Sequence, residues 1–320
     1  MSIKAELFKE RLNRYLTALD GGKPDKVPIS FSVAEWAVKY TERTLQEVFY
    51  SVDIAVEITY KTLEEILNYA DFDIFGGGPS MWWPPMFDAI GSKLYRFPGI
   101  HLDENTTFQY VEEEYMQPEG YDDFIADPTR CLLLKYLPRI NEEFAEPGSY
   151  RALVALIKSA AAYAMFNNMM AEGFQSLTQK YGFVPGMSGL TKAPFDTLGD
   201  SLRGTKGILL DLRRRPDKVL AACKAIVPHN IAYAMIGAGG DTTFPCGMPL
   251  HKGAHPFLNR DQWEKFYWPT LKEVIEGLWA RGKRTWFFAE GDWTPYLDRI
   301  AELPDKSIVF VIDLTDPQKA

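Results

Sequence analysis

The chain has few of the residues that mark several large classes of protein. Only three of its 320 residues are cysteines, and Cys131, Cys223 and Cys246 are widely spaced and odd in number. A disulfide framework therefore does not fit, and the pattern favours a reducing, cytoplasmic environment. No apolar run approaches membrane-spanning length, because even the segment 151–158 is interrupted by charge. The first residues carry an acidic side chain and lack the apolar core of a signal peptide.

Basic charge is also in short supply. The 35 lysines and arginines are outnumbered by 43 acidic residues, which gives a net charge of -8. Nucleic acid is thus not an expected partner, since phosphate binding needs a basic stripe. The glycine clusters 76–78 and 237–240 lack the spacing of nucleotide-binding loops and are interpreted as turns. What is present is an ordinary globular composition, 46% hydrophobic and 24% charged.

Strand-like segments alternate with helix-like segments along the chain. The predicted strands are 27–33, 71–75, 183–188, 242–248, 284–288 and 307–313. Such alternation predicts a parallel α/β protein, and we expect one (β/α)₈ TIM-type barrel domain over residues 1–320. An inserted β-hairpin is predicted near 93–115, where two strand-like segments follow a rigid Trp-Pro loop.

Six barrel strands are two short of a closed barrel. At roughly 30 residues per unit, about 60 residues would complete it. A strand at 307–313 would otherwise present a long unpaired apolar edge, which proteins seldom leave uncovered. We therefore expect the natural chain to continue beyond Ala320.

Polar residues follow the fourth and fifth predicted strands. His251 comes after strand 242–248, and Glu290 and Asp292 come after strand 284–288. A barrel keeps its chemistry at the carboxyl ends of its strands, where an imidazole and a carboxylate could bind a metal or move a proton. Asp313 ends the sixth strand and is a further candidate.

Each candidate also has a plainer interpretation. His251 could be a hydrogen-bonded structural residue, and Glu290 could form a salt bridge with a barrel arginine. Asp292 and Asp313 could serve as caps for the segments that follow them. The residues that could wall an aromatic pocket, or simply pack, are Met81, Trp82, Trp83, Met187 and Phe244.

Several motifs together resemble one known family. The opening segment 11–29 is similar to the start of the uroporphyrinogen decarboxylase superfamily. The motifs Pro249-Leu-His-Lys-Gly-Ala254, Phe266-Tyr-Trp-Pro269, Phe288-Ala-Glu-Gly291 and Phe310-Val-Ile-Asp313 resemble its branch of corrinoid-dependent methyltransferases. The resemblance covers the chain apart from the hairpin region, and it implies a (β/α)₈ barrel.

Two departures narrow the activity that the resemblance implies. The decarboxylases carry arginines just after the first strand, whereas this chain reads Ser30-Phe-Ser-Val-Ala-Glu-Trp36. The thiol-methylating relatives carry a His-x-Cys zinc pair where this chain reads Phe288-Ala-Glu290. What remains resembles the O-demethylating enzymes, which move a methyl group from a small donor, often a methoxylated aromatic, to a corrinoid protein.

The resemblance also implies cofactors and partners. A Zn²⁺ ion acting as Lewis acid would be held by His251, by Glu290, and by Cys246 or a residue beyond Ala320; Cys246 could equally be a small buried hydrophobe. Cobalamin would arrive on a partner corrinoid protein, and a homo-oligomer is compatible with the sequence. The alternatives are methyl transfer from a methyl-corrinoid to a thiol or folate, and a tetrapyrrole-binding protein without this chemistry.

Overall fold

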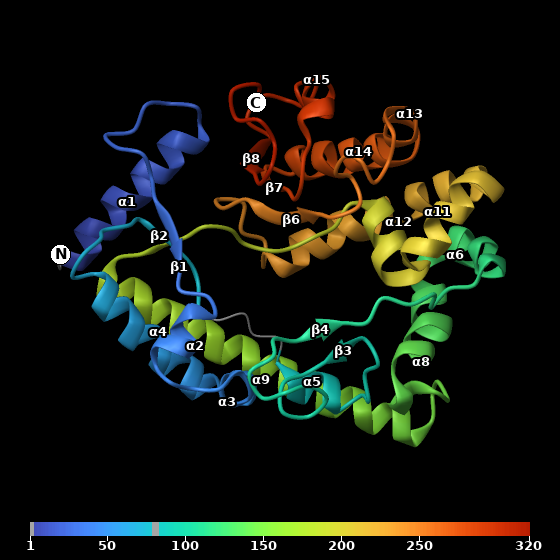
Figure 1. Cartoon of the computed structure of the whole chain (residues 1–320), viewed down its shortest axis with the longest axis horizontal. Coiled ribbons are helices and arrows are strands. Elements are labelled where there is room, and N and C mark those ends of the chain that lie inside the picture. The colour runs from blue at the N-terminus through green and yellow to red at the C-terminus, as the bar shows by residue number, and fades with distance from the viewer. Residues whose placement is uncertain (1–2, 79–82) are drawn as a thin grey trace. The chain divides into compact units, whose positions relative to one another are not determined.

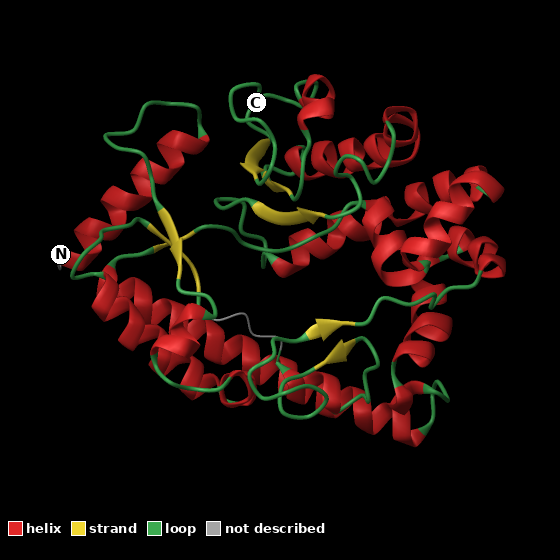
Figure 2. Ribbon diagram, viewed as in Figure 1, coloured by secondary structure: helices red, strands yellow, loops and turns green. Residues whose placement is uncertain are grey.

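The protein is described by a computed structural model that covers residues 3–78 and 83–320. Contacts divide the chain into two compact units (Figures 1 and 2). Unit 1 comprises Met1–Val111 and Leu137–Gly186, and unit 2 comprises Glu112–Tyr136 and Met187–Ala320. Each unit has its own hydrophobic core and its own parallel sheet, so the two are described separately.

Unit 1 surrounds a small parallel sheet with helices. Its strands are β1 (Ser30–Ser32), β2 (Ile74–Gly77), β3 (Tyr95–Arg96), β4 (Gln109–Tyr110) and β5 (Val184–Pro185). Its α-helices are α1 (Ile3–Leu19), α2 (Trp36–Tyr40), α3 (Leu45–Tyr50), α4 (Val52–Ile66), α5 (Pro84–Asp88), α8 (Leu137–Ile140) and α9 (Tyr150–Tyr181).

The parallel sheet of unit 1 has the order β1-β2-β5. Helix α4 begins at the cap Ser51, whose hydroxyl accepts the backbone N–H of Ile54, and it buries an apolar stripe at helical spacing. Strands β3 and β4 pair antiparallel and form a separate hairpin within the predicted region 93–115. The first core cluster, which includes Phe49, Phe72 and Phe183, lies between these elements.

Unit 2 is also helical around a parallel sheet. Its strands are β6 (Cys246–Leu250), β7 (Thr285–Ala289) and β8 (Ile308–Ile312). Its α-helices are α6 (Tyr121–Ala126), α7 (Pro128–Cys131), α10 (Pro194–Asp196), α11 (Gly204–Arg214), α12 (Pro216–Gly237), α13 (Arg260–Gln262), α14 (Trp268–Trp279) and α15 (Leu297–Ile300). Short π-helical segments at 132–136, 197–202 and 263–267 extend α7, α10 and α13.

The sheet of unit 2 has the order β6-β7-β8, with Leu250 of β6 paired to Ala289 of β7 and Ala289 paired to Ile312 of β8. Strand β7 alternates buried and half-buried side chains, with Phe287 and Ala289 fully buried. Helices α12 and α14 pack on each other and contribute apolar residues to the second core cluster. This arrangement places the carboxyl ends of three parallel strands side by side.

The parallel α/β architecture is confirmed, whereas a closed barrel is not present among the described residues. Pairing is sparse where the chain leaves unit 1, because Pro185 has no N–H to donate and glycines follow at 186 and 189. Beyond that point only a single bridge, Leu190 with Gly247, joins the segment to β6. The described strands therefore form two three-stranded sheets rather than one continuous sheet.

Helix α12 corrects the expectation that no segment approaches membrane-spanning length. Among the described residues it is the one helix that is long and apolar enough to cross a membrane by length and composition. Its buried side chains, including Val219, Cys223 and Ile226, belong to the core of unit 2. The helix also contains Pro228 and the hydrogen-bonded Asn230, so its apolar character is explained by packing inside the unit.

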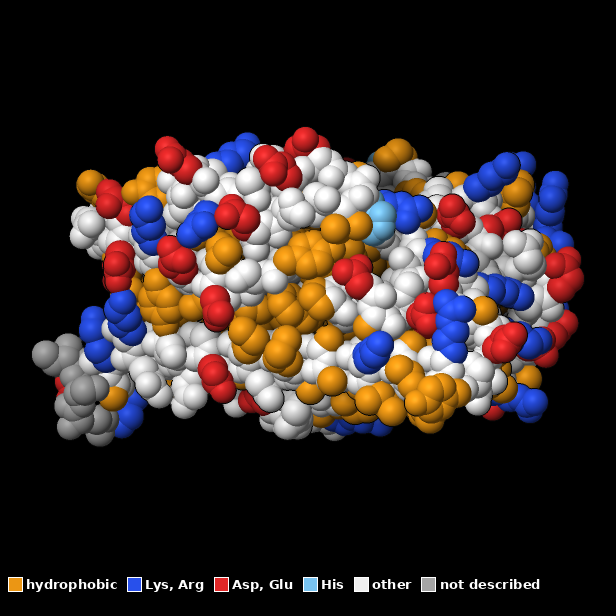
Figure 3. Space-filling view, turned by 90° about the horizontal axis from the view of Figure 1, so that it is seen from below, with side chains coloured by type: hydrophobic (Ala, Val, Ile, Leu, Met, Phe, Trp, Pro, Cys, Tyr) orange, Lys and Arg blue, Asp and Glu red, His pale blue; other side chains and the backbone are white. Residues whose placement is uncertain are grey.

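Helix α9 carries much of the exposed apolar surface of unit 1. Hydrophobic side chains gather in patches on the face drawn in Figure 3. The large apolar residues of α9 that are exposed are Tyr150, Leu153, Leu156, Ile157, Tyr163, Met165 and Met170. Only Ala152, Ala155 and Leu177 of this helix are buried.

Candidate functional site

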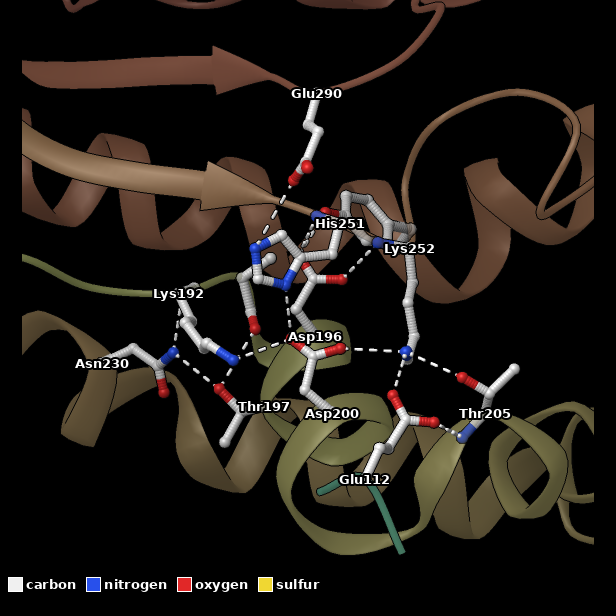
Figure 4. Close-up of polar contacts among 12 residues, drawn as sticks. Glu112, Lys192, Asp196, Thr197, Asp200, Thr205, Asn230, His251, Lys252 and Glu290 are labelled. Atoms are coloured by element: carbon white, nitrogen blue, oxygen red, sulfur yellow. Dashed lines mark hydrogen bonds and ion pairs between the residues drawn. The ribbon is translucent and has the colours of Figure 1, made fainter. Parts of the chain in front are cut away.

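The two residues singled out by sequence, His251 and Glu290, are brought together in unit 2. Because Leu250 pairs with Ala289, the residues that follow each strand leave the sheet side by side. His251 Nε2 lies 3.6 Å from Glu290 Oε2. Both side chains remain open, with 38% and 52% of their side-chain surface exposed. An imidazole and a carboxylate therefore face one another at the carboxyl ends of β6 and β7 (Figure 4).

Two buried aspartates approach His251 from the helical side. Asp196 ends α10, and Asp200 lies one turn later in the π-helical segment 197–202. Asp200 Oδ2 lies 2.7 Å from His251 Nδ1. Asp196 accepts the backbone N–H of His251 at 3.1 Å and that of Lys252 at 2.9 Å. The hydroxyl of Tyr267 donates to the same carboxylate at 2.7 Å.

Two lysines balance the charge of Asp200. Lys192 Nζ donates to Asp200 Oδ2 at 2.7 Å, and Lys252 Nζ lies 3.0 Å from Asp200 Oδ1. Lys252 is buried and also donates to Glu112 Oε2 at 2.9 Å and to Thr205 Oγ1 at 3.0 Å. These contacts join four separate segments of unit 2 around one ammonium group (Figure 4).

The charges of this cluster shift one another's pKa values. Burial, with the neighbouring Asp200 charge, raises the pKa of Asp196 to about 6. Burial alone would also raise the pKa of Asp200, but the hydrogen bond from His251 and the two ammonium groups outweigh it and hold that pKa below its usual range. The hydrogen bond with Asp200 raises the pKa of His251. Asp200 is thus the group of the pair that keeps its negative charge.

The stem of Lys252 runs past Gly199, which precedes Asp200 in the chain. A Cβ atom added at Gly199 would lie 2.5 Å from Lys252 Cδ and 2.6 Å from Cε. These distances are shorter than any normal contact between carbon atoms. The lysine reaches Asp200 because residue 199 has no side chain.

Two predicted site residues lie at the wrong end of β6. Cys246 is the first residue of the strand, so roughly 16 Å of extended chain separates it from His251. Its thiol is fully buried, and burial raises its pKa to about 11. Phe244 precedes the strand altogether, and its backbone N–H donates to Asp241. The sequence analysis began this strand at 242, four residues early, and so misjudged both positions.

Asp292 and Asp313 have local hydrogen-bonding roles near Glu290. Asp292 Oδ1 accepts the backbone N–H of Thr294 at 2.8 Å, which fits the interpretation as a cap. Asp313 Oδ2 accepts the backbone N–H of Gly291 at 2.9 Å. These contacts hold the segment that carries Glu290, and neither carboxylate has a described hydrogen bond or ion pair to His251.

The remaining pocket residues are distributed across the chain. Met81 and Trp82 lie outside the described residues. Trp83 belongs to unit 1, where it is buried and stacks on Phe166 of α9 at a centroid distance of 5.9 Å. Met187 belongs to unit 2 and packs against β6 at Gly247, which leaves room for its sulfur. Neither described residue is placed beside His251 by its contacts.

The fit of a metal ion was tested against these donors. Two ligands of one tetrahedral Zn²⁺ lie about 3.4 Å apart, from metal–ligand distances of about 2.1 Å. The His251 and Glu290 atoms are separated by 3.6 Å, so they fit as a pair of donors. Within the described part of the chain, however, no group of three or more His, Cys, Asp or Glu side chains is placed to hold a metal. The predicted set with Cys246 does not form.

Sequence reasoning missed Asp196, Asp200, Lys192 and Lys252. Their segments were interpreted as helix or passed over, because the partners lie about 50 residues away in the chain. One signal was available. Asp196 and Asp200 stand four apart among apolar neighbours, and carboxylates on the buried face of a helix are costly without partners.

The family of the chain follows from comparison with known sequences. Residues 153–320, more than half of the chain and including every residue of the polar cluster except Glu112, match the model described as uroporphyrinogen decarboxylase (URO-D). The chain belongs to the uroporphyrinogen decarboxylase family. The resemblance seen in the sequence motifs is thereby confirmed.

Among solved structures, the URO-D chain is similar to a methyltransferase from Methanosarcina mazei. The TM-score is 0.54 at 14% sequence identity, and the match covers 93% of this chain and 74% of the other. At this identity the likeness shows a shared fold. A comparison with curated proteins gives no significant match.

Proposed function

We propose that this URO-D family protein is a methyltransferase that takes a methyl group from a small methyl ether, such as a methoxylated aromatic, and passes it to a corrinoid protein. The observation that carries the proposal is the pairing of His251 Nε2 with Glu290 Oε2 at 3.6 Å on the exposed carboxyl ends of two parallel strands. The name of the structurally similar Methanosarcina protein, a methyltransferase, supports the reaction class.

Porphyrinogen decarboxylation is the less favoured activity for this site. It calls for arginines after the first strand to hold several substrate carboxylates. Residues 30–36, which comprise β1 and the turn after it, contain no arginine. The open site in unit 2 presents a carboxylate, Glu290, which would repel an anionic substrate.

The chemistry of an ether explains the need for these side chains. The departing alkoxide or phenoxide is a poor leaving group near neutral pH, so its oxygen needs a positive partner as the carbon–oxygen bond breaks. A zinc ion held by His251 and Glu290, with any further ligand from outside the described residues, would supply a Lewis acid for that oxygen. Glu290 and His251 would orient the ether between β6 and β7, and Asp292 and Asp313 would fix the loop that carries Glu290.

The methyl acceptor is proposed to be a separate protein. The chain contains no Asp-x-His-x-x-Gly sequence of the kind that binds cobalamin. Cob(I)alamin on a partner would be the nucleophile, so the strand ends need supply none. Each reacting pair must be held at about 3–3.5 Å, which requires direct access to the donor methyl group.

The proposal is tested by following the corrinoid spectrum. The purified protein is mixed with a cob(I)alamin-loaded carrier protein and a panel of methoxylated aromatics. We expect conversion to methylcobalamin together with release of the demethylated phenol, and neither product without the protein. Demethylation at full rate in the absence of any corrinoid would exclude this mechanism. Decarboxylation of a porphyrinogen by the same preparation would support the rejected activity instead.

A further inference from the structure

Asp196 and Asp200 hold two different parts of the same residue. Asp196 accepts the backbone N–H groups of His251 and Lys252, and so fixes where the chain leaves β6. Asp200 contacts the ring of His251 at Nδ1, 2.7 Å away. Because the two carboxylates stand four residues apart, both point from one face of a single helical segment.

The contact at Nδ1 determines where the ring carries its proton. An ionised carboxylate can only accept a hydrogen bond, so Nδ1 must be the donor. In the neutral imidazole the lone pair is then on Nε2, the nitrogen that lies 3.6 Å from Glu290. The opposite tautomer would place two acceptors, Nδ1 and Asp200 Oδ2, against each other.

The position of Asp200 is itself fixed. Lys192 binds the oxygen that contacts His251, and Lys252 binds the other oxygen. Lys252 is in turn held by Glu112 and Thr205. With 7% of its side chain exposed, Asp200 cannot turn away to solvent, and the imidazole that it contacts is restrained with it.

We propose that Asp200 is a positioning residue, which fixes the tautomer and the direction of the His251 ring so that the Nε2 lone pair faces the open side of the site beside Glu290. Asp196 holds the backbone of His251, and Asp200 holds its side chain. The effect on the ring is independent of the reaction, whereas the effect on turnover rests on the proposed function.

The tautomer can be measured directly, because the chain has only four histidines. The protein is labelled with ¹⁵N in its imidazole rings, treated with a chelator to remove metal, and studied by NMR at alkaline pH, where the rings are neutral. We expect His251 to carry its proton on Nδ1 in the wild type. A proton on Nε2 in the wild type overturns the proposal without any variant.

The variant Asp200→Asn removes the charge and keeps the size. An amide can present its NH₂ group to Nδ1 and stabilise the other tautomer. We expect the His251 signals to shift towards the Nε2-protonated form, while those of the other three histidines stay unchanged. The matched control is Asp241→Asn, a carboxylate of unit 2 that also lies near a lysine, Lys283, but precedes β6. That variant should leave the His251 signals as they are. An unchanged tautomer in Asp200→Asn, or the same change in both variants, overturns the proposal.

Turnover provides the second measurement. Partners that orient a ligating or catalytic histidine are worth roughly 10- to 100-fold in activity. Asp200→Asn should lower the kcat of methyl transfer by a factor in that range with little change in KM, and Asp241→Asn should change neither. If the wild type shows the expected tautomer but transfers no methyl group, the proposed function fails and the positioning role stands. A full kcat in Asp200→Asn alongside a changed tautomer removes the catalytic part of the inference.

Discussion

The carboxylate of Asp196 accepts the backbone N–H of His251 at 3.1 Å, although the two residues are 55 positions apart in the chain. This contact ties the end of α10 to the end of β6. Asp196 is fully buried, and its other partners, Tyr267 and the N–H of Lys252, leave no lone pair facing solvent. The position of His251 is therefore set by helical segments on both sides of the strand, and four predictions follow the same contacts outward.

Removing either exposed group of the site should abolish its chemistry and spare the fold. We expect His251→Ala and Glu290→Gln each to lower bound zinc and methyl transfer together, by more than about 100-fold in rate, because each variant takes away a donor from a small set. Both side chains are partly exposed, so unfolding midpoints should change little. Elemental analysis and the corrinoid assay measure the two effects.

His229→Ala is the control for this pair. His229 also belongs to unit 2, but its ring contacts Thr129 at the surface. The control should keep both metal and activity. If His251→Ala and Glu290→Gln retain full zinc and full rate, the site has been assigned to the wrong residues.

Cys246 should be inert as a metal ligand and as a nucleophile. Its thiol is buried at the start of β6, and its pKa is raised to about 11, so thiolate is scarce at pH 8. Cys246→Ala is expected to keep its zinc content. Native protein should resist alkylation at all three cysteines, which are buried, and should react three-fold after denaturation. Loss of zinc in Cys246→Ala would restore the ligand set predicted from the sequence.

Acid should weaken the attachment of helix α1 through Asp25. Hydrogen bonds from Arg14 lower the pKa of Asp25 to about 2, from 3.8. A carboxyl whose folded pKa lies below its unfolded pKa adds stability above the unfolded value, and that stability is lost as the pH falls through the folded value. Asp25→Asn should therefore unfold at a lower temperature than wild type at pH 6. The difference should close between pH 4 and pH 2.

Salt provides the check on that prediction. Asp25 is 61% exposed, so its interaction with Arg14 is partly screened, and the difference at pH 6 should narrow at high ionic strength. A gap between variant and wild type that is constant from pH 6 to pH 2 would show that the charge of Asp25 contributes nothing.

Asp211 should be among the most sensitive positions for stability. Its buried carboxylate accepts hydrogen bonds from Arg203 at 2.6 Å and from Tyr121 at 2.9 Å. Asp211→Asn leaves the buried guanidinium without a counter-charge, and breaking such a pair costs about 3–5 kcal/mol. Urea unfolding measures the loss. Asp122→Asn, which breaks the exposed pair with Lys218, should cost far less, and equal losses in the two variants would contradict the argument.

The strands could be predicted because their signal is local. Every predicted strand overlaps an observed one, as with 307–313 and β8 (Ile308–Ile312), since apolar runs between turn residues record burial directly. Helix caps were equally accessible, and Asn259 caps α13 as expected. The exact ends were less accurate, and a start four residues early at β6 was enough to place Cys246 with the wrong group.

The polar cluster could be predicted only in part. His251 and Glu290 each follow a strand, so the parallel topology alone places them together. The contact of Asp200 with His251 depends on how helical segments about 50 residues away are packed, and no local periodicity records that. The sequence therefore indicates the exposed groups of the site but not the buried ones that hold them.

Gly199 shows how little freedom that hidden part leaves to natural variation. Any side chain there would occupy the space of the Lys252 stem, whose ammonium group is already committed to Glu112, Thr205 and Asp200. The smallest possible replacement, alanine, would act at a distance by pulling a positive charge away from the aspartate beneath the imidazole. In a saturation mutagenesis experiment, a residue with no functional group at all should tolerate substitution as poorly as the ionised residues around it.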